Sequence, residues 1–200
     1  GMTLRMKIND AHRIVFERPN LEELTRHGAV VDMHFHSELS DGHDSIAAIA
    51  RRAAELGIGI AVTDHNSIHG AVEIDRFKEV FSIPGIELTS YEGTHLLVYF
   101  YDIRSLLKFY SRDVQPFIGA EIMSSLALEM EEIIRRARQF ETLIIFPHPY
   151  CGTYTGASSV TWNLVKTGAT LNGIATTAEG NVPLSGTVSG RRTWCRRRLC

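Results

Sequence analysis

Strand-sized apolar runs alternate with segments of helical periodicity along most of this 200-residue chain. The expected strands are 29–35, 58–62, 81–88, 96–101 and 142–146. Between them, 44–56, 67–77 and 120–140 place apolar residues on one helical face, and the pattern of 120–140 is the clearest. Strands that alternate with helices indicate an α/β protein with a mainly parallel sheet. In such a sheet, functional groups gather where the strands end.

The composition is that of an ordinary globular protein, with 44% hydrophobic residues, 22% charged residues and a formal net charge of −2. This balance gives no general attraction to nucleic acid or to an anionic membrane. No apolar run approaches the roughly 18 residues that a membrane span needs. Three cysteines are too few for a disulfide framework, and we recognise no secretory signal, so we expect a cytoplasmic setting.

Composition divides the chain into three parts. Residues 1–20 are a lead-in, 21–166 form the organised α/β domain, and 167–200 are atypical. The third part is rich in Gly, Thr and Ser, has no apolar period, and ends in an arginine cluster. Such a composition is typical of a disordered tail.

The sequence Val-Asp-Met-His-Phe-His-Ser places two histidines two residues apart in the first expected strand. Because strand side chains alternate, Asp32, His34 and His36 should share one face, opposite Met33 and Phe35. Two imidazoles on one strand face can hold a cation, and the nearby carboxylate can orient an imidazole. A half-exposed strand with two chance histidines explains this pair equally well.

Further polar residues lie at or near the ends of later strands, and each has an ordinary explanation as a turn, a helix cap or a surface residue. They are Asp41, Asp64, His65, Glu87, His95 and His148. His95 begins its expected strand, so it joins the others only if that strand pairs antiparallel. Imidazole and carboxylate ligands that recur in one α/β pattern favour a Zn, Mn or Fe site of hydrolytic type.

In order and type, these motifs resemble those of the PHP (polymerase and histidinol phosphatase) superfamily. The motifs lie at 32–37, 40–42, 63–66, 84–87, His95 and 147–149. The resemblance implies a distorted (β/α)7-type barrel with two or three divalent ions, Zn, Mn or Fe, at its C-terminal face. It also implies a metal-dependent phosphoesterase whose substrate is a small phosphorylated metabolite, a nucleotide or a short oligonucleotide.

The resemblance assigns the ligands of two ions. His34, His36 and Glu87 would hold the first ion. Glu87 would bridge to a second ion, which His95 and His148 complete. A hydroxide held by these ions would attack phosphorus, because bound cations lower the pKa of water and neutralise phosphoryl oxygens.

Asp41 and His65 would hold a third ion by the same resemblance. No protein side chain is assigned as the general acid or base. Asp32 and Asp64 are the candidates for carboxylates that orient the metal ligands without binding the ions themselves.

One family feature is absent, because the Asp-x-His motif that ends family members has no counterpart here. No Asp follows Asp113, and no His follows His148. We therefore expect a barrel that is incomplete at its C-terminus, and we interpret 167–200 as truncated, frame-shifted or diverged. The missing ligands keep open a second function, a metal-binding domain without catalysis that has a structural or regulatory role.

A third interpretation is an amidohydrolase-like enzyme that cleaves a C–N bond, and the order of the motifs argues against it. We expect no membrane partner and no stable complex with duplex nucleic acid. An incomplete barrel exposes a sheet edge, so whether a second copy of the chain covers that edge stays open.

Overall fold

The computed structural model describes residues 4–8, 12–16, 20–121, 123–148 and 173–174. The chain divides into two compact units, Gly1–Val30 and Val31–Cys200. Most of the atypical segment 167–200, with its arginine cluster, lies outside the described residues. Within the described part, no helix is both long and apolar enough to cross a membrane.

The first unit is a hairpin followed by a short helix. Strand β1 (Leu4–Ile8) pairs antiparallel with β2 (His12–Phe16). Helix α1 (Leu21–His27) begins after Asn20, whose side chain accepts a hydrogen bond from the backbone N–H of Glu23. This bond satisfies one of the N–H groups that a helix start leaves free.

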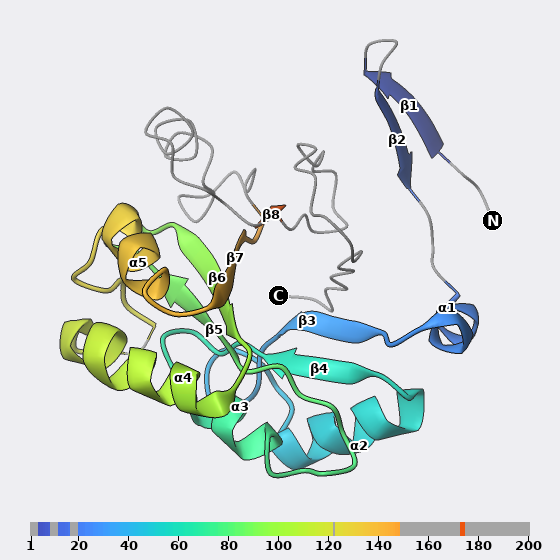
Figure 1. Ribbon diagram of the computed structural model, residues 1–200, viewed down its shortest axis with the longest axis horizontal. Coiled ribbons are helices and arrows are strands. Elements are labelled where there is room, and N and C mark those ends of the chain that lie inside the picture. The colour runs from blue at the N-terminus through green and yellow to red at the C-terminus, as the bar shows by residue number, and fades with distance from the viewer. Residues whose placement is uncertain (1–3, 9–11, 17–19, 122, 149–172, 175–200) are drawn as a thin grey trace. The chain divides into compact units, whose positions relative to one another are not determined.

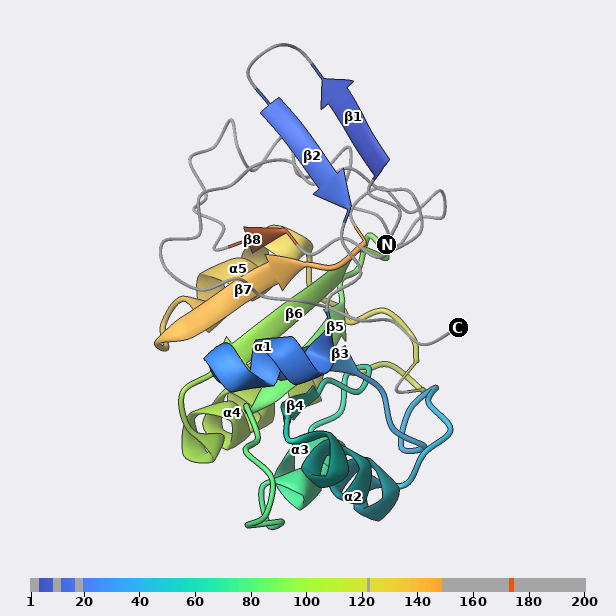
Figure 2. The same cartoon turned by 90° about the vertical axis from the view of Figure 1, so that its right-hand side faces the viewer.

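The second unit is a mixed α/β assembly, which confirms the fold class. Its strands are β3 (Val31–Phe35), β4 (Gly59–Val62), β5 (Gly85–Thr89), β6 (His95–Phe100), β7 (Thr142–Phe146) and β8 (Gly173–Ile174). Its helices are α2 (Ile46–Leu56), α3 (His69–Ile74), α4 (Ile103–Phe109), a π-helical turn (Tyr110–Val114), a 3₁₀ turn (Gln115–Phe117) and α5 (Met130–Ala137). Figures 1 and 2 show α2 and α3 side by side along the sheet of β3 and β4.

Two sheets are joined into one continuous surface. Strand β3 runs parallel to β4, and the second sheet has the order β5-β6-β7-β8. Isolated parallel bridges from Ile60 to Ser82 and from His65 to Glu87 link the two sheets. The bridges bring the carboxyl ends of β4 and β5 together. The described strands do not close into a barrel.

Strand β6 contradicts the expectation of a mainly parallel sheet, because it is antiparallel to both β5 and β7. The connection from β5 to β6, residues 90–94, is the cause: a parallel crossover needs about a dozen residues or more. The reversal pairs His95 with Thr89. The first residue of β6 therefore lies at the edge where β5 ends.

The helix expected over 120–140 is much shorter, since only Met130–Ala137 is α-helical. The preceding backbone is bonded elsewhere: the N–H of Leu126 donates to Thr89 O, and that of Ala127 to Phe117 O. Tertiary hydrogen bonds have replaced the helical ones in this stretch. Helix α2 lies close to its expected range and ends at Gly57, which adopts a left-handed conformation with φ of 63°.

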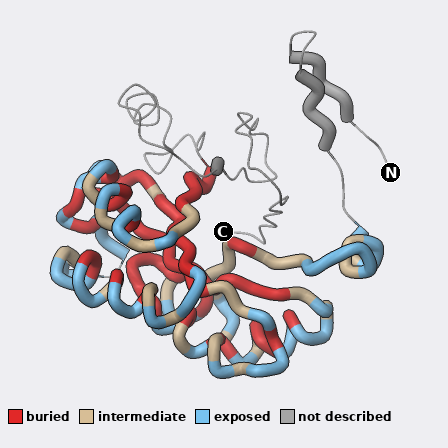
Figure 3. Tube along the Cα trace, viewed as in Figure 1, coloured by how far each residue is buried: buried red, intermediate tan, exposed pale blue. Residues whose placement is uncertain are grey.

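Alternation along β5 separates the apolar core from the polar face. Ile86 and Leu88 are fully buried in the cluster that includes Phe109 of α4 and Ile133 of α5. Glu87 lies between them on the opposite face of the strand. Strands β4 and β5 are buried throughout and β6 over most of its length, β3 is mostly half-buried, and the outer surfaces of the helices are exposed (Figure 3).

Strand β3 departs from simple alternation. Val31 and Met33 pack in one apolar cluster, but Phe35 packs in another, beside α2. The register against β4 shifts between Asp32 and Phe35. The prediction that Met33 and Phe35 share a face is therefore wrong, because this irregularity turns the end of the strand. Such irregularities re-aim side chains.

Candidate metal centre

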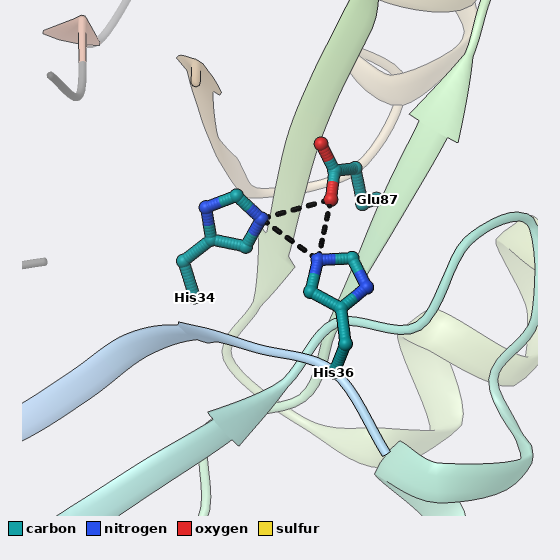
Figure 4. Close-up of side chains that lie close together, drawn as sticks. All are labelled: His34, His36 and Glu87. Atoms are coloured by element: carbon teal, nitrogen blue, oxygen red, sulfur yellow. Dashed lines mark hydrogen bonds and ion pairs between the residues drawn. The ribbon is translucent and has the colours of Figure 1, made fainter. Parts of the chain in front are cut away.

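The carboxylate of Glu87 on β5 is the centre of a buried group of imidazoles. Its Oε2 lies 2.8 Å from His34 Nε2 and 2.8 Å from His36 Nε2, both at the end of β3. The two ring nitrogens are 2.9 Å apart. Figure 4 shows both rings directed at the same carboxylate oxygen. Three donor atoms that meet in this way suit a single cation.

The second oxygen of Glu87 faces two further histidines. Oε1 lies 2.9 Å from His95 Nδ1 and 3.5 Å from His148 Nε2. His95 reaches this place because β6 pairs antiparallel with β5. The sequence had predicted that His95 joins the other residues only if its strand is antiparallel. His148 follows β7 directly, with a left-handed φ of 31°. Each oxygen of the carboxylate thus faces its own pair of imidazoles.

Asp41 and His65 complete a third side of the cluster. Asp41 Oδ1 lies 2.9 Å from His36 Nδ1, and Asp41 Oδ2 lies 3.6 Å from His65 Nε2. His65 Nε2 is also 3.9 Å from Glu87 Oε2. Within the described residues, three groups have ligand atoms close enough to share an ion: His34–His36–Glu87, His36–Asp41–His65 and His65–Glu87–His95.

Four buried polar atoms of this cluster have no hydrogen-bond partner. They are Glu87 Oε1 and the Nδ1 atoms of His65, His95 and His148. The contact between His95 and Glu87 is short but lacks hydrogen-bond geometry. An unpartnered buried polar atom costs about 1–3 kcal/mol. Two of the four, Glu87 Oε1 and His95 Nδ1, face each other at 2.9 Å inside the cluster, whereas His65 and His148 face the carboxylates through Nε2. A carboxylate oxygen and imidazole nitrogens that converge in this way are ligands of divalent transition metals, so the residues present fit such ions.

Mutual contacts shift the ionisation of the cluster. Burial opposes protonation of His36, but its hydrogen bonds to Asp41 and Glu87 outweigh burial and raise the pKa of the imidazole to about 10. The hydrogen bond from His36 lowers the pKa of Asp41 to about 2, against the effect of burial. Burial also opposes ionisation of Glu87, yet the charge of His34 and the neighbouring imidazoles hold the pKa of Glu87 well below its usual value. A cation bound to the carboxylates would take the place of these protons.

Asp32 and Asp64 make backbone and hydroxyl contacts. Asp32 Oδ1 accepts a hydrogen bond from the backbone N–H of His34 at 3.3 Å. Asp64 accepts hydrogen bonds from Ser37 and Ser40, in the turn that carries Asp41.

Three positioning residues received no such role from the sequence. Ser37 and Ser40 bind Asp64. Asn66, in a left-handed conformation with φ of 48°, accepts from Thr89 N–H and donates to the backbone oxygen of Ser124. Asn tolerates this conformation better than most residues. An Asn directly after His65 was therefore the feature of the sequence that could have indicated this turn. His69 is exposed and belongs to none of the three ligand groups of the described residues.

Fold and site together define an α/β protein with a candidate multi-metal centre at its strand ends. The chain belongs to the PHP family: the model of the PHP domain matches residues 32–190. This confirms the resemblance found in the sequence. A comparison with curated proteins finds no match.

Several solved structures share the fold. A candidate metal-dependent phosphoesterase from Bifidobacterium adolescentis has 15% identity and a TM-score of 0.54, over 73% of this chain and 76% of that chain. An amidohydrolase from Chromobacterium violaceum, with bound sulfate and no metal, gives the same four values: 15%, 0.54, 73% and 76%. The lesion-specific endonuclease Q of Pyrococcus furiosus has 19% identity and a TM-score of 0.60, over 73% of this chain and 41% of that chain. At these identities the likeness concerns the fold.

Proposed function

We propose that this chain is a metal-dependent phosphoesterase. Its substrate would be a small phosphorylated metabolite, a nucleotide or a short oligonucleotide. Family membership supports the class of enzyme. The observation that carries the proposal is the meeting of His34 Nε2, His36 Nε2 and Glu87 Oε2 within 2.9 Å of one another. The proposal includes a cytoplasmic setting and no membrane or duplex partner. The net charge of −2, which gives no general attraction to nucleic acid or an anionic membrane, supports the second part.

Glu87 would divide the centre into two ligand sets. Its Oε2, with His34 and His36, would hold one ion, and its Oε1, with His95 and His148, would hold a second. Each oxygen of the carboxylate already faces the corresponding imidazoles. A carboxylate with donors on both sides is the usual bridge in two-metal hydrolytic sites.

Asp41 and His65 would hold a third ion. The side chain of Asp41 is 38% exposed, whereas that of Glu87 is 1% exposed. The third position therefore lies nearest to solvent, where a substrate would enter. When bound, two or three Zn, Mn or Fe ions would supply activated water and neutralise the charge of the phosphoryl group. The imidazoles and carboxylates would orient these ions and keep bulk water away from the inner two.

Metal content and hydrolysis test the proposal together. Purified protein loaded with Mn²⁺ or Zn²⁺ should hold at least two ions per chain and hydrolyse a chromogenic phosphate ester. His34→Ala should lose most of both properties. His69→Ala is the matched control, because His69 is exposed and lies outside the three ligand groups. Hydrolysis that survives His34→Ala, or that persists after complete chelation, would overturn the proposal.

A metal-binding domain without catalysis is the second candidate. The observation in its favour is that residues 149–200 contain neither Asp nor His, so this segment supplies no Asp-x-His ligand pair. Bound metal without hydrolysis of any phosphate ester would favour this candidate. The same measurements therefore separate the two.

A further inference from the structure

Asp64 is buried beside a candidate ligand, yet its carboxylate serves a neighbouring turn. It directly precedes His65 and is 1% exposed. Its Oδ1 accepts hydrogen bonds from Ser37 N–H at 2.7 Å and from Ser40 Oγ at 2.8 Å. Its Oδ2 accepts from Ser37 Oγ at 2.8 Å. Hydrogen bonds to an ionised acceptor are about twice as strong as neutral ones.

The turn at 37–42 carries Asp41 and is tightly wound. Ser37 O accepts hydrogen bonds from the N–H groups of Ser40 and Gly42, at 3.1 and 2.9 Å. A Cβ at Gly42 would lie 2.1 Å from His36 O, so only glycine fits there. Ser40 Oγ also lies 3.4 Å from Asp41 Oδ1. The position of Asp41 thus depends on a turn that Asp64 holds at two of its serines.

Helix α3 confines Asp64 from the other side. A Cβ added at Gly70 would lie 2.2 Å from Asp64 Oδ2 and 2.7 Å from a side-chain carbon of Val62. The carboxylate is therefore held between α3 and the turn. A glycine at this point of α3 leaves room for it.

We propose that Asp64 is the positioning residue that assembles the His36–Asp41–His65 group. It fixes His65 through the chain, as its direct neighbour, and Asp41 through Ser37 and Ser40. Asp41 is the exposed member of the group, so its place depends most on the turn. The inference rests on the proposed function, because it concerns which of the proposed ions needs Asp64. Glu87, His95 and His148 lie outside this turn, so a ligand set made of these three residues depends on it least.

Calorimetric titration of the metal-free full chain with Mn²⁺ tests the inference. Asp64→Ala should weaken the binding site that uses Asp41 by about 10–100-fold, the usual cost of losing a residue that orients a ligand, and weaken the other sites less. Asp64→Asn should have a smaller effect than Asp64→Ala, because its amide oxygen still accepts from Ser37 N–H and Ser40 Oγ but carries no charge. Asp102→Ala is the matched control: Asp102 accepts from Ser105 N–H and Oγ, both at 2.8 Å, at the start of α4.

Hydrogen exchange in the metal-free protein supplies a second readout. The amide of Ser37 should exchange faster in Asp64→Ala than in wild type, since its acceptor is gone, and Asp102→Ala should leave it unchanged. Unchanged exchange at Ser37, or equal weakening of every metal site in Asp64→Ala, would overturn the inference. Wild-type protein that binds no Mn²⁺ or Zn²⁺ would instead overturn the proposed function, and the exchange result would still decide whether Asp64 holds the turn.

Discussion

Two regions of the second unit bury charged side chains, and they do so in different ways. The first is the candidate metal centre around Glu87. The second, here called the α5 ion network, consists of Arg112, Asp113, Glu132, Arg135 and Arg136. In this network Asp113 is 4% exposed and contacts Arg112 Nε at 2.7 Å and Arg136 Nη1 at 3.4 Å. Arg136 Nε also donates to Glu132 at 2.6 Å.

The α5 ion network is complete by itself. Three arginines face two carboxylates. The guanidinium groups of Arg112 and Arg136 also lie over the rings of Phe140 and Phe117, at 5.1 and 4.7 Å. None of its atoms is among the buried unpartnered ones of the described residues. A region of this kind can stabilise a fold, and its charges are paired without a ligand.

The candidate metal centre differs by the same measure. Its carboxylates face imidazoles, which carry positive charge only when protonated, and four of its buried atoms have no hydrogen-bond partner among the described residues. Burial of charge alone is therefore no sign of function. Buried ligand atoms that converge without hydrogen-bond partners are the feature that indicates a cation site.

Glu87→Gln should have the largest effect, because it removes the charge shared by both proposed ion positions. We expect metal affinity and phosphoesterase activity to fall by more than about 100-fold, since losing only a partner behind a ligand costs about 10–100-fold. Titration with Mn²⁺ and a chromogenic phosphate ester measure the two effects. Glu73→Gln, at an exposed position of α3, is the control. Unaltered metal binding in Glu87→Gln would erase the contrast between the two regions.

Asp113→Ala should affect stability and leave metal binding intact. Removing one partner of a buried ion pair costs about 3–5 kcal/mol, and we expect about 2–3 kcal/mol because Arg112 is 45% exposed. Urea unfolding of the metal-free variant measures this loss. A variant that loses Mn²⁺ binding at unchanged stability would contradict the division of roles between the regions.

The sequence predicted which side chains lie together at the strand ends better than it predicted the fold around them. Motif residues such as His34, Glu87 and His148 are close in space because strand ends meet at one edge, which alternation and strand order already suggest. The resemblance to a family added the expected grouping. These inferences depend on short-range patterns that a single chain displays.

The parts that failed depend on long-range contacts. The direction of β6 follows from a short connection, and the early end of the helix expected at 120–140 follows from bonds such as Leu126 N–H to Thr89 O. The sequence named Asp64 as a candidate to support the ligands, but it did not predict its partners Ser37 and Ser40, which lie 27 and 24 residues away. The spacing of apolar residues along the chain does not predict hydrogen bonds between residues so far apart.

Metal addition should stabilise the wild-type protein through the metal centre alone. A ligand at ten times its Kd adds about 1.4 kcal/mol if it binds the folded state only. Thermal unfolding with and without Mn²⁺, reversed by a chelator, measures the shift. We expect the shift to persist in Asp113→Ala and to vanish in Glu87→Gln. An equal shift in Glu87→Gln would place the bound metal outside the proposed centre.

The smallest expected effect is a pH dependence that belongs to the α5 ion network. Hydrogen bonds from Arg135 and Arg136 lower the pKa of Glu132 from 4.5 to about 2. A lowered carboxyl pKa stabilises the folded state above pH 4.5, and this contribution is lost as pH falls through about 2. The stability difference between metal-free wild type and Glu132→Gln should therefore shrink between pH 5 and pH 2, and it should weaken in high salt because the pair is partly exposed. Comparing the two variants cancels the titration of Asp41 and Glu87, so a difference that stays constant with pH would show that Glu132 contributes through packing rather than charge.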